Sequence, residues 1–203
     1  MKIRRFIGKT FLKLRGWNVD AAKLPAVGIL LGAPHTSNWD AIFFLASTWS
    51  EGRSARFLIK DSLGNAPILG ALIRALGGIP VTRSSAEGMV TDLANKMQSS
   101  DDLILAITPK GTRSQRKYWK SGFYKIAQTA GVPVQLGFVD SSTKTVGWAE
   151  AYYLSGNIEE DMEKIRAFYA TKTGIRPELA SVPRLRAEDD DDARAYLLGK
   201  SDA

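Results

Sequence analysis

The sequence contains no cysteine and only one histidine, and both scarcities narrow the chemistry open to it. Without cysteine, disulfides, thiolate metal sites and thiol nucleophiles are all excluded, and the composition suits a reducing compartment. With one histidine, a metal site built from several imidazoles is impossible. Any imidazole chemistry in this chain therefore belongs to His35.

Long apolar runs are also missing. The longest apolar-looking region, residues 66–81, is interrupted by Arg74 and by several glycines, so it falls short of the ~18 residues that a membrane-spanning helix needs. Near the amino terminus, charges recur too often for a secretory signal. We therefore expect a cytoplasmic protein without a transmembrane anchor.

The length and charge of the chain bound its organisation and its partners. With 203 residues, of which 44% are hydrophobic, the chain can bury one sizeable core and is too short for two ordinary domains. Lys and Arg number 28 against 21 Asp and Glu, and this excess favours acidic partners such as phosphates, anionic lipid, an acidic carrier protein or nucleic acid. No recognised nucleic-acid motif is present, so we expect no nucleic-acid partner.

The first segment has the pattern of a cationic amphipathic helix. Its apolar side chains recur at spacings of three and four, with basic residues between them: Ile3, Phe6, Ile7, Phe11 and Leu14. Such a helix either docks its apolar stripe on the core or lies in a lipid interface. The crowding of basic residues favours an anionic membrane surface as partner, so we expect peripheral attachment on the inner face of the membrane.

Beyond this helix, short apolar runs alternate with helical patterns, which is typical of an α/β sheet with substantial parallel pairing. We expect strands near residues 27–31, 56–59, 79–81, 103–107 and 134–138, a further strand past Lys144 that runs through Trp148 and Tyr153, and helices near residues 40–49, 67–76, 86–97, 122–130 and 159–169. The expected fold is a single α/β domain with a mixed, mostly parallel sheet flanked by helices. We divide the chain into an amphipathic helix (1–20), the main domain (21–180) and a carboxyl-terminal tail or helix (181–203).

One chemically informative segment follows the first of these strands. The run Pro34-His35-Thr36-Ser37-Asn38-Trp39-Asp40 leaves a strand and enters a helix, which is where α/β proteins place ligands. Ser37 and Asp40 also fit a helix-capping pattern. If His35 precedes the helix and folds back over its first turn, Asp40 can fix the imidazole tautomer and leave the other nitrogen to accept a hydroxyl proton.

A second informative segment, Thr108-Pro109-Lys110-Gly111-Thr112-Arg113-Ser114, follows the strand near residues 103–107. Pro109 and Gly111 suit a tight turn, which is the purely structural interpretation. Alternatively, glycine allows close approach of the backbone to an anion, and the planar fork of Arg113 suits phosphate. Lys60 and Arg83 follow two other expected strands, so the three cations Lys60, Arg83 and Arg113 together predict a phosphate cradle.

These segments resemble the glycerolipid acyltransferase family, whose best-known members are the 1-acyl-glycerol-3-phosphate acyltransferases. His35 and Asp40 match the family's H-x4-D motif; residues 78–83, 111–113 and 132–134 match its later blocks, in the family's order. The resemblance implies an α/β fold, a His35 base assisted by Asp40, and a substrate site formed by Lys60, Arg83, Lys110, Gly111, Thr112 and Arg113. It also implies a lysophospholipid acceptor, an acyl-CoA or acyl carrier protein donor, and neither metal nor cofactor.

Lys110 departs from the family pattern, which usually has glutamate at this position. The change removes a hydroxyl acceptor and adds a cation, or it is harmless if the side chain points to solvent. We therefore expect a phospholipid-biosynthesis acyltransferase that acts on a lysophospholipid such as 1-acyl-glycerol-3-phosphate. The alternatives are an enzyme for another lyso-lipid acceptor and a catalytically weak module that binds anionic lipid.

Overall fold

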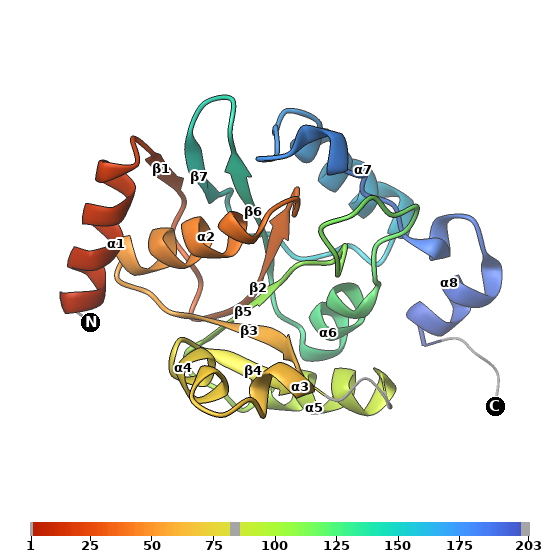
Figure 1. The fold of residues 1–203 in the computed structure, drawn as a ribbon. Coiled ribbons are helices and arrows are strands. Elements are labelled where there is room, and N and C mark those ends of the chain that lie inside the picture. Colours follow the sequence, from red (N-terminus) through yellow and green to blue (C-terminus); the bar gives the residue numbers. More distant parts are fainter. Residues whose placement is uncertain (1, 82–85, 200–203) are drawn as a thin grey trace.

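The computed structural model describes residues 2–81 and 86–199, which form a seven-stranded sheet with helices on both faces (Figure 1). The strands are β1 (Asn18–Ala21), β2 (Val27–Ala33), β3 (Ala55–Lys60), β4 (Gly78–Val81), β5 (Leu103–Ile107), β6 (Val134–Asp140) and β7 (Thr145–Trp148). The α-helices are α1 (Lys2–Leu14), α2 (Asn38–Ser50), α3 (Asp61–Gly64), α4 (Leu69–Ala75), α5 (Ala86–Gln98), α6 (Gly122–Ala130), α7 (Ile158–Ala170) and α8 (Asp191–Leu197). Two short 3-10 helices, η1 (Pro177–Leu179) and η2 (Arg186–Glu188), lie between α7 and α8.

The strand order is β1-β7-β6-β2-β5-β3-β4, and all neighbouring pairs are parallel except β6 with β7. This confirms the expected α/β fold with a mixed, mostly parallel sheet. The central strand β2 is apolar throughout because both of its faces are covered. Its residues alternate: Ile29 and Leu31 join the core cluster under α6 and α7, and Leu30 joins Trp148 on the other face.

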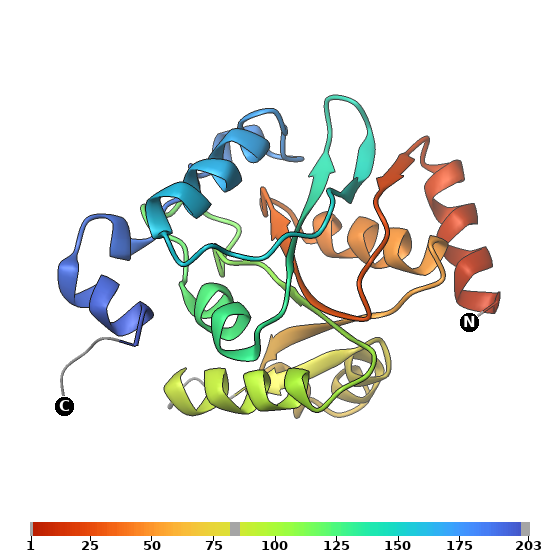
Figure 2. The same ribbon diagram turned by 180° about the vertical axis from the view of Figure 1, so that it is seen from behind.

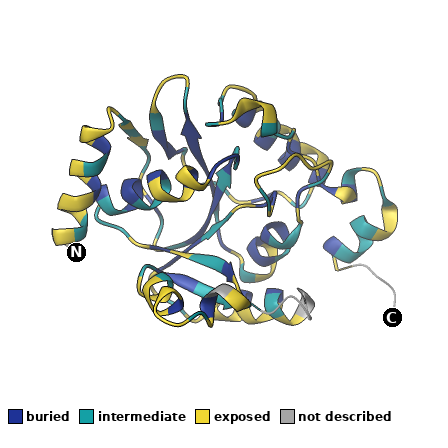
Figure 3. Ribbon diagram, in the orientation of Figure 1, coloured by how far each residue is buried: buried dark blue, intermediate teal, exposed yellow. Residues whose placement is uncertain are grey.

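Different helices cover the two faces of the sheet. Buried side chains of α5, α6 and α7 pack with β2, β5 and β6 on one face, whereas α2 covers the other and α1 packs against α2 (Figures 1 and 2). The central strands are buried, and most of α1 is exposed (Figure 3). Only Gly8 and Leu12 of α1 are buried.

Two local expectations need correction. The strand expected past Lys144 is present as β7, but it ends at Trp148 and does not continue to Tyr153; beyond it, Tyr152 forms an isolated bridge with Val134. Strand β1 was not expected; it pairs with β7, more than one hundred residues away along the chain, and it spans the expected boundary between residues 20 and 21. A four-residue edge strand has little periodicity of its own, so its pairing partner determines it.

The acidic run near the carboxyl terminus starts a helix. Asp190 caps α8 by accepting from the Ala193 amide, and Asp191 and Asp192 occupy the first turn. Carboxylates are favoured there because the amino-terminal end of a helix carries partial positive charge. Within residues 181–199, the helical segments are η2 and α8.

Candidate active site

The predicted site residues follow neighbouring parallel strands. In the sheet, β2, β5, β3 and β4 are consecutive neighbours, so their carboxyl ends meet at one edge. His35 follows β2, the 108–114 loop follows β5, and Lys60 ends β3. Arg83, expected after β4, lies outside the described residues.

His35 and Asp40 meet at this edge. The imidazole Nδ1 lies 3.3 Å from the Asp40 carboxylate Oδ2, and the two side chains are 15% and 8% exposed. His35 precedes α2, and the turn between His35 and Asp40 brings the ring back beside the first turn of the helix, which is the arrangement that the two side chains need in order to meet. With Nδ1 beside the carboxylate, Nε2 is the nitrogen left for a substrate proton.

The local fold around Asp40 explains this approach. Oδ2 of Asp40 also accepts hydrogen bonds of 2.7 Å from the Thr36 and Ser37 amides, while Ser37 caps the helix by accepting from Trp39. This capping box satisfies amides that the helix leaves unpaired and fixes the orientation of the carboxylate. The other oxygen, Oδ1, is buried and has no hydrogen-bond partner among residues 2–81 and 86–199.

The loop after β5 turns at a position that requires glycine. The Gly111 amide donates to the Thr108 carbonyl, which closes the tight turn that Pro109 and Gly111 indicated. Gly111 has a φ of +67°, and a Cβ there would lie 3.0 Å from Lys120 Cε. Beyond it, Arg113 is exposed, and Thr112 accepts from the Ser114 amide. The turn therefore leaves the Arg113 side chain accessible.

Lys110 does not point to solvent. Its side chain is buried, and its ammonium donates to the carbonyls of Leu179 at 2.7 Å and Arg113 at 3.2 Å. Burial lowers the pKa of Lys110, and the nearby negative charge of Asp40 opposes this effect and raises it. The ammonium is thus held by main-chain carbonyls and lies within the electrostatic reach of the His35–Asp40 pair.

A segment that the sequence did not single out crosses this edge of the sheet. Residues 173–181, which we call the strap, follow α7 and contact both loops of the site. The Thr36 hydroxyl accepts from the Arg176 amide at 3.1 Å, and a Cβ on Gly174 would lie 2.8 Å from that hydroxyl. In the sequence, Gly174 and Pro177 directly after a helix predict a turn at this place. They do not predict which part of the protein the turn contacts.

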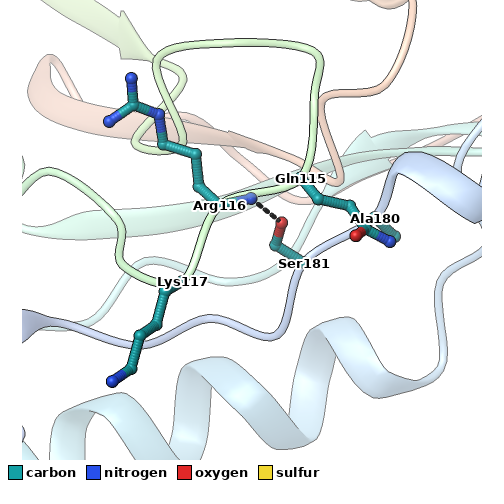
Figure 4. A pocket seen from close by; sticks show the side chains of 5 residues that line it. All are labelled: Gln115, Arg116, Lys117, Ala180 and Ser181. Carbon is teal, nitrogen blue, oxygen red and sulfur yellow. Dashed lines mark hydrogen bonds between the residues drawn. The ribbon is translucent and has the colours of Figure 1, made fainter.

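The strap also meets the continuation of the glycine turn. The Arg116 amide donates to the Ser181 hydroxyl at 2.8 Å, and Gln115 donates to the Glu178 carbonyl at 2.7 Å. Between these segments lies a hollow of about 410 Å³, lined by Gln115, Arg116, Lys117, Ala180 and Ser181 (Figure 4). The side chains of Arg116 and Lys117 extend from the loop in different directions (Figure 4).

Not every motif of the resemblance lies at this edge. The run Val132-Pro133-Val134 leads into the start of β6, at the opposite edge from His35. There the Pro133 carbonyl accepts from the Ile29 amide at 2.9 Å, and Gly28 packs closely against Pro133. This block therefore sets how β6 begins beside β2 and does not contact the site.

Comparisons with known proteins agree with this arrangement. The Acyltransferase family model matches residues 18–135, which include β1 to β5, both site loops and the start of β6. A search of curated proteins finds no significant match. Among solved structures, the 1-acyl-sn-glycerophosphate acyltransferase PlsC from Thermotoga maritima is similar, with a TM-score of 0.51 and 19% identity over 81% of this chain and 73% of that one.

The described helices include none that is both long enough and apolar enough to cross a bilayer. The family match spans more than half of the sequence and contains the His35–Asp40 pair together with the Gly111 turn. With its sheet order and the placement of these residues at one edge, the chain belongs to the Acyltransferase family.

Proposed function

We propose that the protein transfers a fatty acyl group from an acyl thioester, carried by CoA or by acyl carrier protein, to the free hydroxyl of a lysophospholipid such as 1-acyl-glycerol-3-phosphate. The observation that carries this proposal is the 3.3 Å approach of His35 Nδ1 to the Asp40 carboxylate, beside the Gly111 turn, in a chain of the Acyltransferase family. The product class places the enzyme in phospholipid biosynthesis.

In the proposed mechanism His35 is a general base. Its Nε2 takes the proton from the acceptor hydroxyl while that oxygen bonds to the thioester carbonyl carbon. Asp40 holds the ring and stabilises the imidazolium that forms. The carbon–sulfur bond then breaks, and the departing sulfur receives the proton from the imidazolium. We propose direct transfer, because the chain has no cysteine and the neighbouring hydroxyls are engaged otherwise: Ser37 caps α2 and Thr36 accepts from the strap.

We assign the acceptor phosphate to cations at the same edge of the sheet. Lys60 ends β3 and is exposed, and Arg113 is exposed beyond the Gly111 turn. Arg83 is the third cation of the proposed set and lies outside the described residues. Guanidinium and ammonium groups favour phosphate through charge-assisted hydrogen bonds, and the main chain at Gly111 and Thr112 lies between Lys110 and Arg113.

We further propose that α1 lies on an anionic membrane surface. Its apolar residues Ile3, Phe6 and Leu14 are 76%, 71% and 80% exposed, whereas its contact with α2 is made through Gly8 and Leu12 on another side. The helix carries no acidic residue. Exposed apolar side chains flanked by cations favour burial at a lipid interface, where they leave water and meet anionic headgroups.

This exposed apolar surface leads toward the site. Arg15, just after α1, lies over the Trp39 ring at 4.8 Å, and Trp39 and Ile42 in the first turns of α2 are each 44% exposed. Trp39 adjoins the capping box that orients Asp40. A membrane held by α1 would therefore lie near the end of α2 that follows His35, which suits an acceptor drawn from the lipid phase.

The test is acyl transfer by purified protein. Radiolabelled acyl-CoA and acyl carrier protein would each be offered with lyso-acceptors that carry or lack a phosphate, in vesicles. We expect transfer to the phosphate-bearing acceptor, and we expect His35→Ala to reduce the rate by ~10²- to 10⁴-fold, the usual contribution of a general base. A near wild-type rate for His35→Ala would contradict the mechanism.

The other outcomes separate the remaining alternatives. Equal or better transfer to an acceptor without phosphate would favour a different lyso-lipid and would remove the proposed role of Arg113. If the protein binds vesicles but forms no product with any pair of donor and acceptor, it is a lipid-binding module. The change from the family's usual glutamate to Lys110 would then accompany the loss of activity.

A further inference from the structure

Lys110 and the strap are connected more closely than a surface turn requires. The Lys110 ammonium is buried, with one N–H on the Leu179 carbonyl in the strap and another on the Arg113 carbonyl in its own loop. A carboxylate at this position could not donate to either carbonyl. The usual glutamate of the family is therefore chemically incompatible with the contacts that this chain makes.

The same ammonium acts on the catalytic pair. Asp40 has one buried oxygen, Oδ1, without a hydrogen-bond partner in the described part of the chain, and an unpaired buried charge is costly. The Asp40 carboxylate and the Lys110 ammonium attract each other across this site. Lys110 thus supplies positive charge to a carboxylate that is only partly satisfied by the capping box.

We propose that Lys110 is a positioning residue with two roles: it holds the strap on the loop after β5, and its positive charge offsets the buried negative charge of the Asp40 carboxylate beside His35. The inference rests on the proposed function, because it assigns Asp40 and His35 their catalytic parts. Lys110 itself is placed out of contact with the substrate phosphate. In this protein the side chain at position 110 binds the strap instead of the acceptor lipid.

The strap is suited to this role because it contacts both loops of the site. It meets the loop before α2 through Thr36 and Arg176, and the loop after β5 through Lys110 and Arg116. It begins at the end of β6, where Thr173 donates to the Asp140 carboxylate. Loss of the Lys110 contact would therefore loosen the segment that packs on Thr36, next to His35.

The positive charge of Lys110 should change the protonation of His35 in a direction that can be measured. The segments that meet here carry the following charged side chains: Asp40 on α2, Lys110, Arg113, Arg116 and Lys117 after β5, Asp140 on β6, and Lys172, Arg176 and Glu178 after α7. A positive charge near an imidazole disfavours its protonation, and removing that charge favours it. Because His35 is the only histidine, its imidazole signals in an NMR titration report on this site alone.

The experiment compares Lys110→Met and Lys110→Glu with wild type. We expect the titration midpoint of His35 and the acid limb of the pH–rate profile to move to higher pH, further in Lys110→Glu than in Lys110→Met. We also expect amide hydrogen exchange in the strap to become roughly tenfold faster, since the Leu179 carbonyl loses its donor.

Lys125→Met is the matched control. Lys125 is half-buried, whereas Lys110 is buried, and it too donates to a main-chain carbonyl, that of Tyr196. It lies on α6 and forms no hydrogen bond or ion pair with Asp40 or the strap among the described residues. This variant should leave both the His35 titration and strap exchange unchanged. If Lys110→Met behaves like Lys125→Met, the proposal is overturned. If wild type transfers no acyl group, the proposed function fails, while the imidazole titration still tests Lys110.

Discussion

Asp40 performs two tasks with one oxygen. Its Oδ2 closes the capping box at the start of α2 and also lies beside His35, so helix formation and ring orientation depend on the same atom. Because both functions use the same oxygen, removing the whole Asp40 side chain would disturb both. A substitution that keeps the acceptor and removes the charge separates them.

Asp40→Asn is that substitution. The amide oxygen can still accept from Thr36 and Ser37, so we expect the free energy of unfolding to fall by only about 0.3–1 kcal/mol, the value of a charge at a helix start. The imidazolium formed during catalysis loses its counter-charge, so kcat should fall on the order of 10²-fold. Chemical denaturation and steady-state kinetics on one preparation measure both; equal losses in stability and rate would contradict the separation.

The His35–Asp40 contact could be predicted from the sequence because it is local. Five residues separate the two, and a helix start between them fixes the geometry once Ser37 is recognised as a cap. The role of Lys110 could not be predicted in the same way. Its partner Leu179 lies 69 residues away, in a segment without periodicity, so only the folded chain brings the ammonium and the carbonyl together.

At the level of elements, α1 behaves differently from the helices of the core. It is amphipathic, yet most of its apolar stripe is exposed. Phe11 packs against Phe43, and the helix rests on α2 through Gly8, where a Cβ would lie 2.4 Å from the Ala46 carbonyl oxygen. Lys9 and Lys13 line a hollow of about 450 Å³ beside Trp17. The sequence left core packing and interfacial binding open, and the exposed stripe favours the second.

Phe6→Ser with Leu14→Ser tests the exposed stripe. Both side chains are largely exposed in the protein, so the fold should lose little stability, whereas each would lose about 1.5–3 kcal/mol of burial at full insertion into an interface. We expect partitioning onto anionic vesicles, measured by sedimentation, to fall by roughly tenfold or more.

Val182→Ser is the matched control for this experiment. Val182 is 71% exposed, as Phe6 is, but it lies just after the strap instead of on α1. Vesicle binding by this variant should equal that of wild type. If the double variant and Val182→Ser reduce vesicle binding alike, or if neither reduces it, the assignment of the membrane surface to α1 is wrong.

Across the whole molecule, the expected order of strands and helices follows from apolar runs that are short, separated and covered on both faces. Long-range pairing decides the rest: β1 depends on β7, and the region after Trp148 depends on contacts with β6 such as the bridge between Val134 and Tyr152. These contacts connect distant parts of the chain and leave only weak local patterns. The central strands of the sheet can therefore be predicted from the sequence, whereas its edge strands and the segments that cover it cannot.

Acid stability should depend on Asp140, where β6, the following turn and the strap meet. Burial acts to raise the pKa of Asp140, but hydrogen bonds from Ser142, Thr173 and Thr143 outweigh it and lower the pKa from its ordinary value of 3.8. A carboxyl whose pKa is lower in the folded state stabilises the fold above its unfolded pKa. That contribution is lost as the pH falls through the folded-state pKa.

Asp140→Asn should therefore lower the free energy of unfolding at pH 7 by about 2 kcal/mol, the order of a hydrogen bond to a charged group. The difference from wild type should shrink as the pH falls below 3.8 and Asp140 becomes neutral in both states. Urea unfolding across this pH range measures it. Asp92→Asn, on an exposed face of α5, provides the control because its carboxylate has no hydrogen bond or ion pair to another described residue. A difference that stays constant with pH for Asp140→Asn would mean that the amide merely packs badly, and that the ionised carboxylate does not hold the strap to the end of β6.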